Sequence, residues 1–222
     1  MIHIRHRLCD WAEFDADQKR LLDALESRAK IAPPFIVATV CDQPQLQKIA
    51  AEVWSQAMCP AQDALGPIAA TPRKDRIRLG YYSADFHEHA TCRLMAQLFE
   101  LHDKDRFELV AFSFGPDTQD EMRQRVEGAF DQFIDVRYMS DREVAQASRE
   151  VGIDIAIDLK GHTQDARPGI FSYRCAPVQA SYLGYPGTLG AEYMDYLVAD
   201  KVVIPPDSQV HYFEKIAYLP YS

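Results

Sequence analysis

The chain has 222 residues, of which 47% are hydrophobic, and its formal net charge is −9 at pH 7. That length suits one large domain, or a medium domain with an appendage, and the composition allows a sizeable core. The negative charge argues against a protein that holds a phosphate backbone, and no apolar run approaches the roughly 20 residues of a membrane span. We therefore expect neither a nucleic acid nor a membrane as a partner.

The five cysteines do not have the spacing of a disulfide framework or of a Cys-x-x-Cys motif. Their number is odd, and the first residues of the chain do not resemble a secretory signal. Both observations predict a reduced protein in the cytoplasm.

The first part of the chain has a helical pattern, which covers residues 10–58. Pro33 and Pro34 should interrupt it, because an interior proline removes a backbone hydrogen bond and clashes with the preceding turn. A second helix should begin with Asp42 as its N-cap and Pro44 in its first turn, where a missing N–H is harmless.

The pattern changes at residue 76. The preceding stretch, 59–75, is punctuated by prolines and a glycine, and we expect it to be a linker. After it, apolar runs alternate with helical patterns, which predicts right-handed crossovers and a mostly parallel sheet. We therefore divide the chain into a helical linker segment, 1–75, and an α/β domain with a doubly wound sheet, 76–222. The expected strands are Ile77–Ser83, Phe107–Phe114, Phe133–Met139, Ile153–Leu159, Val178–Leu183 and Tyr196–Ile204.

Capping signals support the helices between these strands. Thr118 with Glu121, and Ser140 with Glu143, have the spacing of a capping box. Gly152 stands where a glycine commonly ends a helix, directly before the fourth expected strand.

A polar loop with Asp85, His87 and His89 follows the first expected strand, where an open parallel sheet binds its ligands. The first turn has no Gly-x-Gly-x-x-Gly and the chain has no P-loop, so we do not expect a dinucleotide cofactor or P-loop chemistry. His87 and His89 could chelate a metal with His162 as a third ligand, but we favour a single histidine as a base or as a donor to a leaving group. A solvated loop is the alternative.

Two further segments follow later strands. Residues 158–163 place a carboxylate, an amine, an imidazole and a hydroxyl at one strand end, and Gly161 there allows a tight turn. Residues 183–190 contain three glycines and a proline, so bare N–H groups could face an oxygen-rich ligand. Either segment could instead be an ordinary turn.

Taken together, these segments resemble the catalytic region of the O-GlcNAc transferase family, which includes bacterial members and the plant SPINDLY-type proteins. The resemblance runs from about residue 76 to the end. The glycine-tyrosine-proline-glycine-threonine string is highly specific in this order with the other segments, whereas any one segment alone would be a weak signal. The matching residues are Gly80–Phe86 with His89 and Thr91, Asp158–Arg167, Ala176–Ala180, Leu183–Thr188 with Met194–Tyr196, and Glu214–Pro220.

The resemblance implies the Rossmann-like N-terminal lobe of a two-lobed GT-B glycosyltransferase. It implies inverting transfer of GlcNAc from UDP-GlcNAc to Ser or Thr hydroxyls of a protein or peptide acceptor, with no catalytic metal and no cofactor besides the nucleotide-sugar. His89 matches a position beside the donor sugar and is the candidate catalytic residue. His162 departs from the aromatic residue of other members. The candidate donor- and acceptor-binding residues are Thr91, Lys160, His162, Thr163, Gly184, Tyr185, Pro186, Gly187 and Thr188.

The sequence holds no evident cradle for the departing diphosphate, which the family places in its C-terminal catalytic lobe. We therefore expect a fragment that lacks this lobe and the tetratricopeptide repeats, binds nucleotide-sugar weakly and is inactive alone. Alternatives are half of a SPINDLY-type O-fucosyltransferase, a non-catalytic α/β module that binds protein, and a small-molecule sensor domain.

Overall fold

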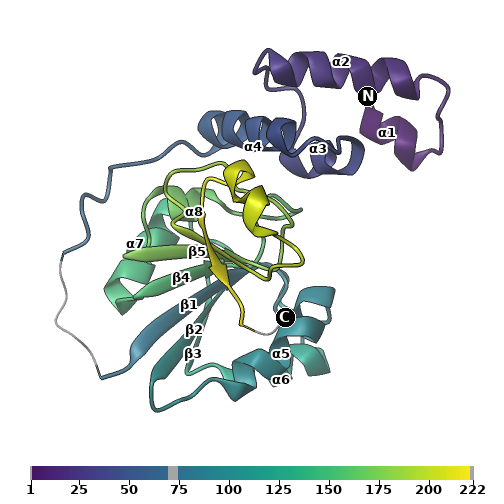
Figure 1. The fold of residues 1–222 in the computed structure, drawn as a ribbon. Coiled ribbons are helices and arrows are strands. Elements are labelled where there is room, and N and C mark those ends of the chain that lie inside the picture. Colours follow the sequence, from purple (N-terminus) through teal and green to yellow (C-terminus); the bar gives the residue numbers. More distant parts are fainter. Residues whose placement is uncertain (1, 70–74, 221–222) are drawn as a thin grey trace.

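The computed structural model describes residues 2–69 and 75–220 (Figure 1). Within these ranges, helices come first and a mixed helix and strand region follows, as the sequence predicts. The first helices are α1 (Ile2–Arg7), α2 (Phe14–Glu26), α3 (Pro34–Val40) and α4 (Pro44–Met58). None of the described helices is long and apolar enough to cross a membrane.

The helical segment has a small core of its own, in which Leu21 and Leu25 of α2 contact Val37 of α3 and Leu46 of α4. Pro34 begins α3 in the first helical turn, where its fixed backbone angle suits a helix start. The prediction of Asp42 as an N-cap is wrong.

The residue at the N-cap of α4 is Gln43, which makes no side-chain capping bond, and Pro44 occupies the first turn as expected. Within the expected linker, 59–75, residues 59–69 form no helix or strand, and residues 70–74 lie outside the described residues. The domain border at 75/76 stays a prediction.

All pairings in the seven-stranded sheet are parallel, and the strand order is β3-β2-β1-β4-β5-β6-β7. The order reverses between β1 and β4, so the ends of these two strands form the topological switch point. The strands are β1 (Ile77–Ser83), β2 (Phe107–Ser113), β3 (Gln132–Asp135), β4 (Ile155–Asp158), β5 (Val178–Tyr182), β6 (Tyr196–Ala199) and β7 (Lys215–Tyr218).

Helices cover both faces of the sheet (Figure 1). Neighbouring residues of β1 point to opposite faces, so Tyr81 packs with α5 and α6, whereas Tyr82 packs with α7 and α8. This two-sided burial explains the apolar strand sequences. The helices of this region are α5 (Ala90–Leu101), α6 (Glu121–Ala129), α7 (Asp141–Val151), α8 (Gly169–Ser172) and a 3-10 helix, η1 (Pro206–His211).

Several local predictions differ from the structure at the ends of elements. The second and fifth strands end one residue early, and the fourth covers only Ile155–Asp158. The third strand stops at Asp135, whose carboxylate accepts the amide of Arg137 and turns the chain. The sixth stops at Ala199, because the side chain of Asp200 accepts the next amides in the same way. The box of Thr118 with Glu121 is wrong, since Asp120 caps α6.

Two capping predictions are confirmed. Ser140 and Glu143 form both bonds of a capping box at the start of α7. Gly152 ends the same helix with φ 76°, in the left-handed region that glycine tolerates.

Helix α4 joins the helical segment to the sheet region. The hydroxyl of Ser55 donates to the carbonyl of Leu189 at 2.6 Å, and Lys48 Nζ donates to the carbonyl of Val210 at 3.0 Å. At Gly190, φ is +64° and an added Cβ would lie 2.4 Å from the backbone of Ala51. The helix therefore packs directly on the chain that follows β5.

Candidate active site

The turns after β1, β4 and β5 meet at one edge of the sheet, as the sequence predicts. Lys160 Nζ, after β4, contacts both carboxylate oxygens of Asp85, after β1, at 2.9 and 2.8 Å. An added Cβ at Gly184, after β5, would lie only 1.8 Å from the carbonyl oxygen of Leu159. We call these three turns the switch-point edge.

His89 lies at the rim of the switch-point edge, at the N-cap of α5. Its Nδ1 accepts the amide N–H of Thr91 at 3.2 Å, which satisfies one of the free donors of the first helical turn. A neutral imidazole has one donor and one acceptor nitrogen, so this bond places the ring proton on Nε2. The side chain is 43% exposed, and the geometry favours a hydrogen-bond donor over a base at Nε2.

The turn after β4 is held by Asp158. Its two carboxylate oxygens accept the amides of Lys160 at 2.9 Å and Gly161 at 3.0 Å. Burial raises the pKa of Asp158 to about 6, against the lowering effect of these bonds and of the Lys160 charge. The hydroxyl of Thr163 donates to the carbonyl of Lys160 and closes the turn.

His162 is buried between this turn and the next one. Its Nε2 contacts the carbonyl of Leu189 at 3.0 Å and the hydroxyl of Ser55 at 3.4 Å. Burial lowers the pKa of His162, so the ring is neutral and donates to the carbonyl. Its ring also contacts that of Tyr185 edge-on, with the centroids 5.4 Å apart.

The three histidines considered for a metal site do not form one cluster. His87 and His89 lie side by side, with ring centroids 5.7 Å apart, whereas Nε2 of His162 is used inside the protein. Within residues 2–69 and 75–220, no group of three metal-ligating side chains could hold an ion.

The glycine-rich loop after β5 is hydrogen-bonded on its buried side to Glu214. The site prediction missed this residue. Glu214 Oε2 accepts the hydroxyl of Thr188 at 2.6 Å, and Oε1 accepts the amide of Leu189 at 2.7 Å. Thr188 Oγ1 itself accepts the amides of Gly190 and Phe213. Burial raises the pKa of Glu214. These bonds, the Glu214 brace, tie the loop to the chain just before β7.

Within this loop, exposure separates the candidate binding residues. The Pro186 ring is exposed and Gly187 is half-buried, whereas Tyr185 and Thr188 are buried. Burial also raises the pKa of Tyr185. An added Cβ at Gly187 would come within 2.9 Å of the Tyr185 ring, so the glycine allows this close packing.

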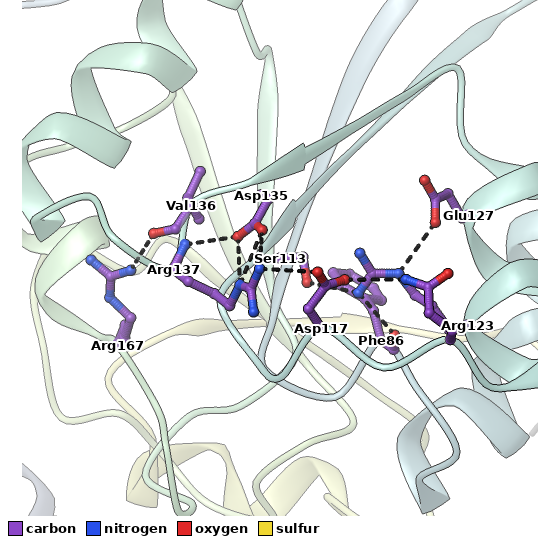
Figure 2. Close-up of polar contacts among 10 residues, drawn as sticks. Phe86, Ser113, Asp117, Arg123, Glu127, Asp135, Val136, Arg137 and Arg167 are labelled. Atoms are coloured by element: carbon purple, nitrogen blue, oxygen red, sulfur yellow. Dashed lines mark hydrogen bonds and ion pairs between the residues drawn. The ribbon is translucent and has the colours of Figure 1, made fainter.

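A group of arginines lies beyond the switch-point edge, at the ends of β2 and β3 (Figure 2). Arg123 is 7% exposed and contacts the carbonyl of Phe86, the hydroxyl of Ser113 and the carboxylate of Glu127. Arg137 pairs with Asp135 and Asp117, and Arg167 with Asp141. Because each guanidinium already has a carboxylate partner, none of these three is a ready cation for a diphosphate.

A parallel sheet with helices on both faces, and polar turns that converge at its switch point, defines a Rossmann-like lobe of the kind that binds nucleotides. In a comparison of structures, the chain matches a mutant of the Thermobaculum terrenum O-GlcNAc transferase with a TM-score of 0.78 and 30% sequence identity. The match covers 93% of this chain and 41% of that one. The sheet region is therefore a lobe of the GT-B type.

The model of glycosyl transferase family 41 matches residues 63–222, and the chain belongs to this family. The chain is 39% identical over 146 residues to the probable UDP-N-acetylglucosamine–peptide N-acetylglucosaminyltransferase SEC of Arabidopsis thaliana. It is 30% identical over 147 residues to a protein of the same plant with the same enzyme name, SPINDLY. These matches cover 66% and 65% of this chain but only 15% and 16% of those proteins.

Proposed function

We propose that this chain forms the N-terminal catalytic lobe of an inverting protein O-glycosyltransferase, which moves GlcNAc from UDP-GlcNAc to Ser or Thr hydroxyls. Family membership and the enzyme names of the relatives support this proposal. The observation that carries it is the convergence of the turns after β1, β4 and β5, with the exposed ring of His89 at their rim.

The structure matched is more than twice as long as this chain. We therefore infer that a second catalytic lobe faces the switch-point edge and completes the donor site. That lobe would supply the positive charge that the departing diphosphate requires. No cofactor enters the proposal besides the nucleotide-sugar. We also propose that the complete protein carries tetratricopeptide repeats outside this chain and that it works in the cytoplasm.

In the proposed reaction, the acceptor hydroxyl oxygen forms a bond to the anomeric carbon of the sugar, opposite the UDP oxygen. The bond from that carbon to UDP breaks, the electron pair leaves with UDP, and the hydroxyl proton passes to a base. His89 contributes as a donor: its Nε2–H reaches an oxygen of the sugar or diphosphate while Nδ1 stays in the helix cap. A preorganised donor of this kind is worth about 10²–10³ in rate.

The other candidate residues divide by their contacts. We assign contact with the sugar to Gly184, Pro186 and Gly187, whose backbone forms the front of the loop. The remaining side chains support the edge from within the protein. Polar atoms of Thr91, Lys160, His162, Thr163 and Thr188 have partners in the protein, and the ring of Tyr185 packs against His162.

The test is a transfer assay with the complete gene product, a Ser/Thr peptide and either UDP-GlcNAc or a nucleotide-activated fucose. We expect the peptide to gain the mass of one N-acetylhexosamine, and the 222-residue chain alone to show weak UDP-GlcNAc binding and no turnover. Transfer of fucose only would identify a SPINDLY-type fucosyltransferase half. A folded gene product that transfers neither sugar would contradict an enzyme and support a protein-binding module.

A further inference from the structure

A buried ion pair occupies the switch point itself. The side chains of Lys160 and Asp85 are only 6% and 10% exposed, and the ammonium contacts both carboxylate oxygens. Removing two charges from water is costly, so a buried pair of this kind is weak evidence for stability. Loss of one partner, however, leaves an uncompensated charge in the site.

The same carboxylate lies next to the ring of His89. Asp85 Oδ2 accepts the hydroxyl of Thr91 at 3.3 Å and lies 3.5 Å from His89 Nδ1. Asp85 is thus shared between the ammonium on one side and the helix cap on the other. Other titratable groups nearby are His87, whose ring centroid is 5.7 Å from that of His89, and Glu88, which pairs with Arg93. Asp120 acts on His87 in turn.

The charge of Lys160 acts against the attraction between Asp85 and the ring of His89. A carboxylate 3.5 Å from Nδ1 favours a proton on that nitrogen, because opposite charges attract. Such a proton would end the acceptance of the Thr91 amide and release the ring from the cap. The ammonium of Lys160, bound to both oxygens of Asp85, offsets this attraction.

We propose that Lys160 and Asp85 are positioning residues, whose ion pair keeps His89 in the cap of α5 with Nδ1 unprotonated and Nε2–H turned outward. Asp85 anchors Thr91, and Lys160 neutralises Asp85. The consequence for sugar transfer rests on the function proposed above. The consequence for the ring of His89 is independent of that function. The effect on the ring and the effect on sugar transfer can therefore be tested separately.

The first test measures the ring directly by long-range ¹H–¹⁵N NMR of the histidines in the 222-residue chain above neutral pH, with His89 assigned by His89→Asn. We expect an unprotonated Nδ1 in the unchanged chain. Lys160→Met and Lys160→Gln should move the Nδ1 signal to the protonated range, and adding Asp85→Asn should reverse the shift. Glutamine can still donate a hydrogen bond to Asp85. If Lys160→Met does not fold, Lys160→Gln therefore gives the deciding measurement. An unprotonated Nδ1 in folded Lys160→Gln would overturn the proposal.

The second test uses transfer by the complete gene product. Lys160→Gln should lower kcat at least 10-fold, and the double variant with His89→Asn should be no slower than His89→Asn alone, because Lys160 acts through His89. A purely structural role would add its loss to that of His89→Asn. If the unchanged protein transfers sugar and Lys160→Gln is fully active, the positioning role is refuted but the proposed function stands. If the unchanged protein transfers no sugar, the proposed function is refuted.

Discussion

Replacement of Gly184 by alanine should separate two turns of the switch-point edge. The added Cβ would lie 1.8 Å from the carbonyl oxygen of Leu159, whereas ordinary contacts begin at 3.4 Å. The two backbones must therefore move about 1.6 Å apart, and neither is a flexible side chain that could give way. We expect a loss of about 3 kcal/mol or more in the free energy of unfolding, which lowers Tm by about 6–12 °C in a chain of this size.

Gly128→Ala is the matched control. Gly128 lies inside α6, and an added Cβ there meets nothing within 4 Å. This change should raise stability by about 0.5–1 kcal/mol, because alanine favours a helix over glycine. Thermal and urea unfolding of the two variants give the comparison. A Gly184→Ala variant as stable as the unchanged chain would show that the turns after β4 and β5 do not pack backbone against backbone.

Three further changes test the remaining parts of the account. In Glu214→Gln, an NH₂ group replaces one of the two oxygens that accept from Thr188 and Leu189. Urea unfolding should show a loss of about 1–3 kcal/mol in the free energy of unfolding. No loss would contradict the role of Glu214 in holding the loop. Because the pKa of Asp158 is raised to about 6, its ionisation costs stability as pH rises. The unchanged chain should lose about 2–3 kcal/mol relative to Asp158→Asn between about pH 4 and pH 7.5, and a constant difference would refute this. Ser140→Ala removes a capping box and should lower Tm, at a cost of about 1 kcal/mol, whereas an unchanged Tm would argue against the cap.

Local patterns predicted the parts of the fold that are encoded locally. The apolar run of β1 begins and ends where expected, since both faces of that strand are buried. The Ser140 box and Gly152 were found because each signal lies within a few residues of the helix end it serves. By contrast, β7 (Lys215–Tyr218) was missed. It is an edge strand with no fully buried residue, and its lysine and alanine leave no apolar run in the sequence.

The internal contacts of the candidate site could not be predicted in this way. The pair of Asp85 and Lys160 joins residues 75 positions apart, and Thr188 and Glu214 are 26 apart. Its position at a strand end suggested that Lys160 faces a ligand, but its ammonium group is bound to the carboxylate of Asp85. His162 is similar: its residue type suggested a site residue, and the structure shows its Nε2 bound to the carbonyl of Leu189.

Transfer by a His89→Asn variant of the complete gene product tests the central claim most directly. Asparagine is a good N-cap, so the variant should keep the start of α5 and its Tm while losing the Nε2–H at the switch-point edge. With UDP-GlcNAc as donor, we expect kcat to fall about 10²–10³-fold. A folded His89→Asn enzyme that transfers sugar at the rate of the unchanged protein would contradict the account.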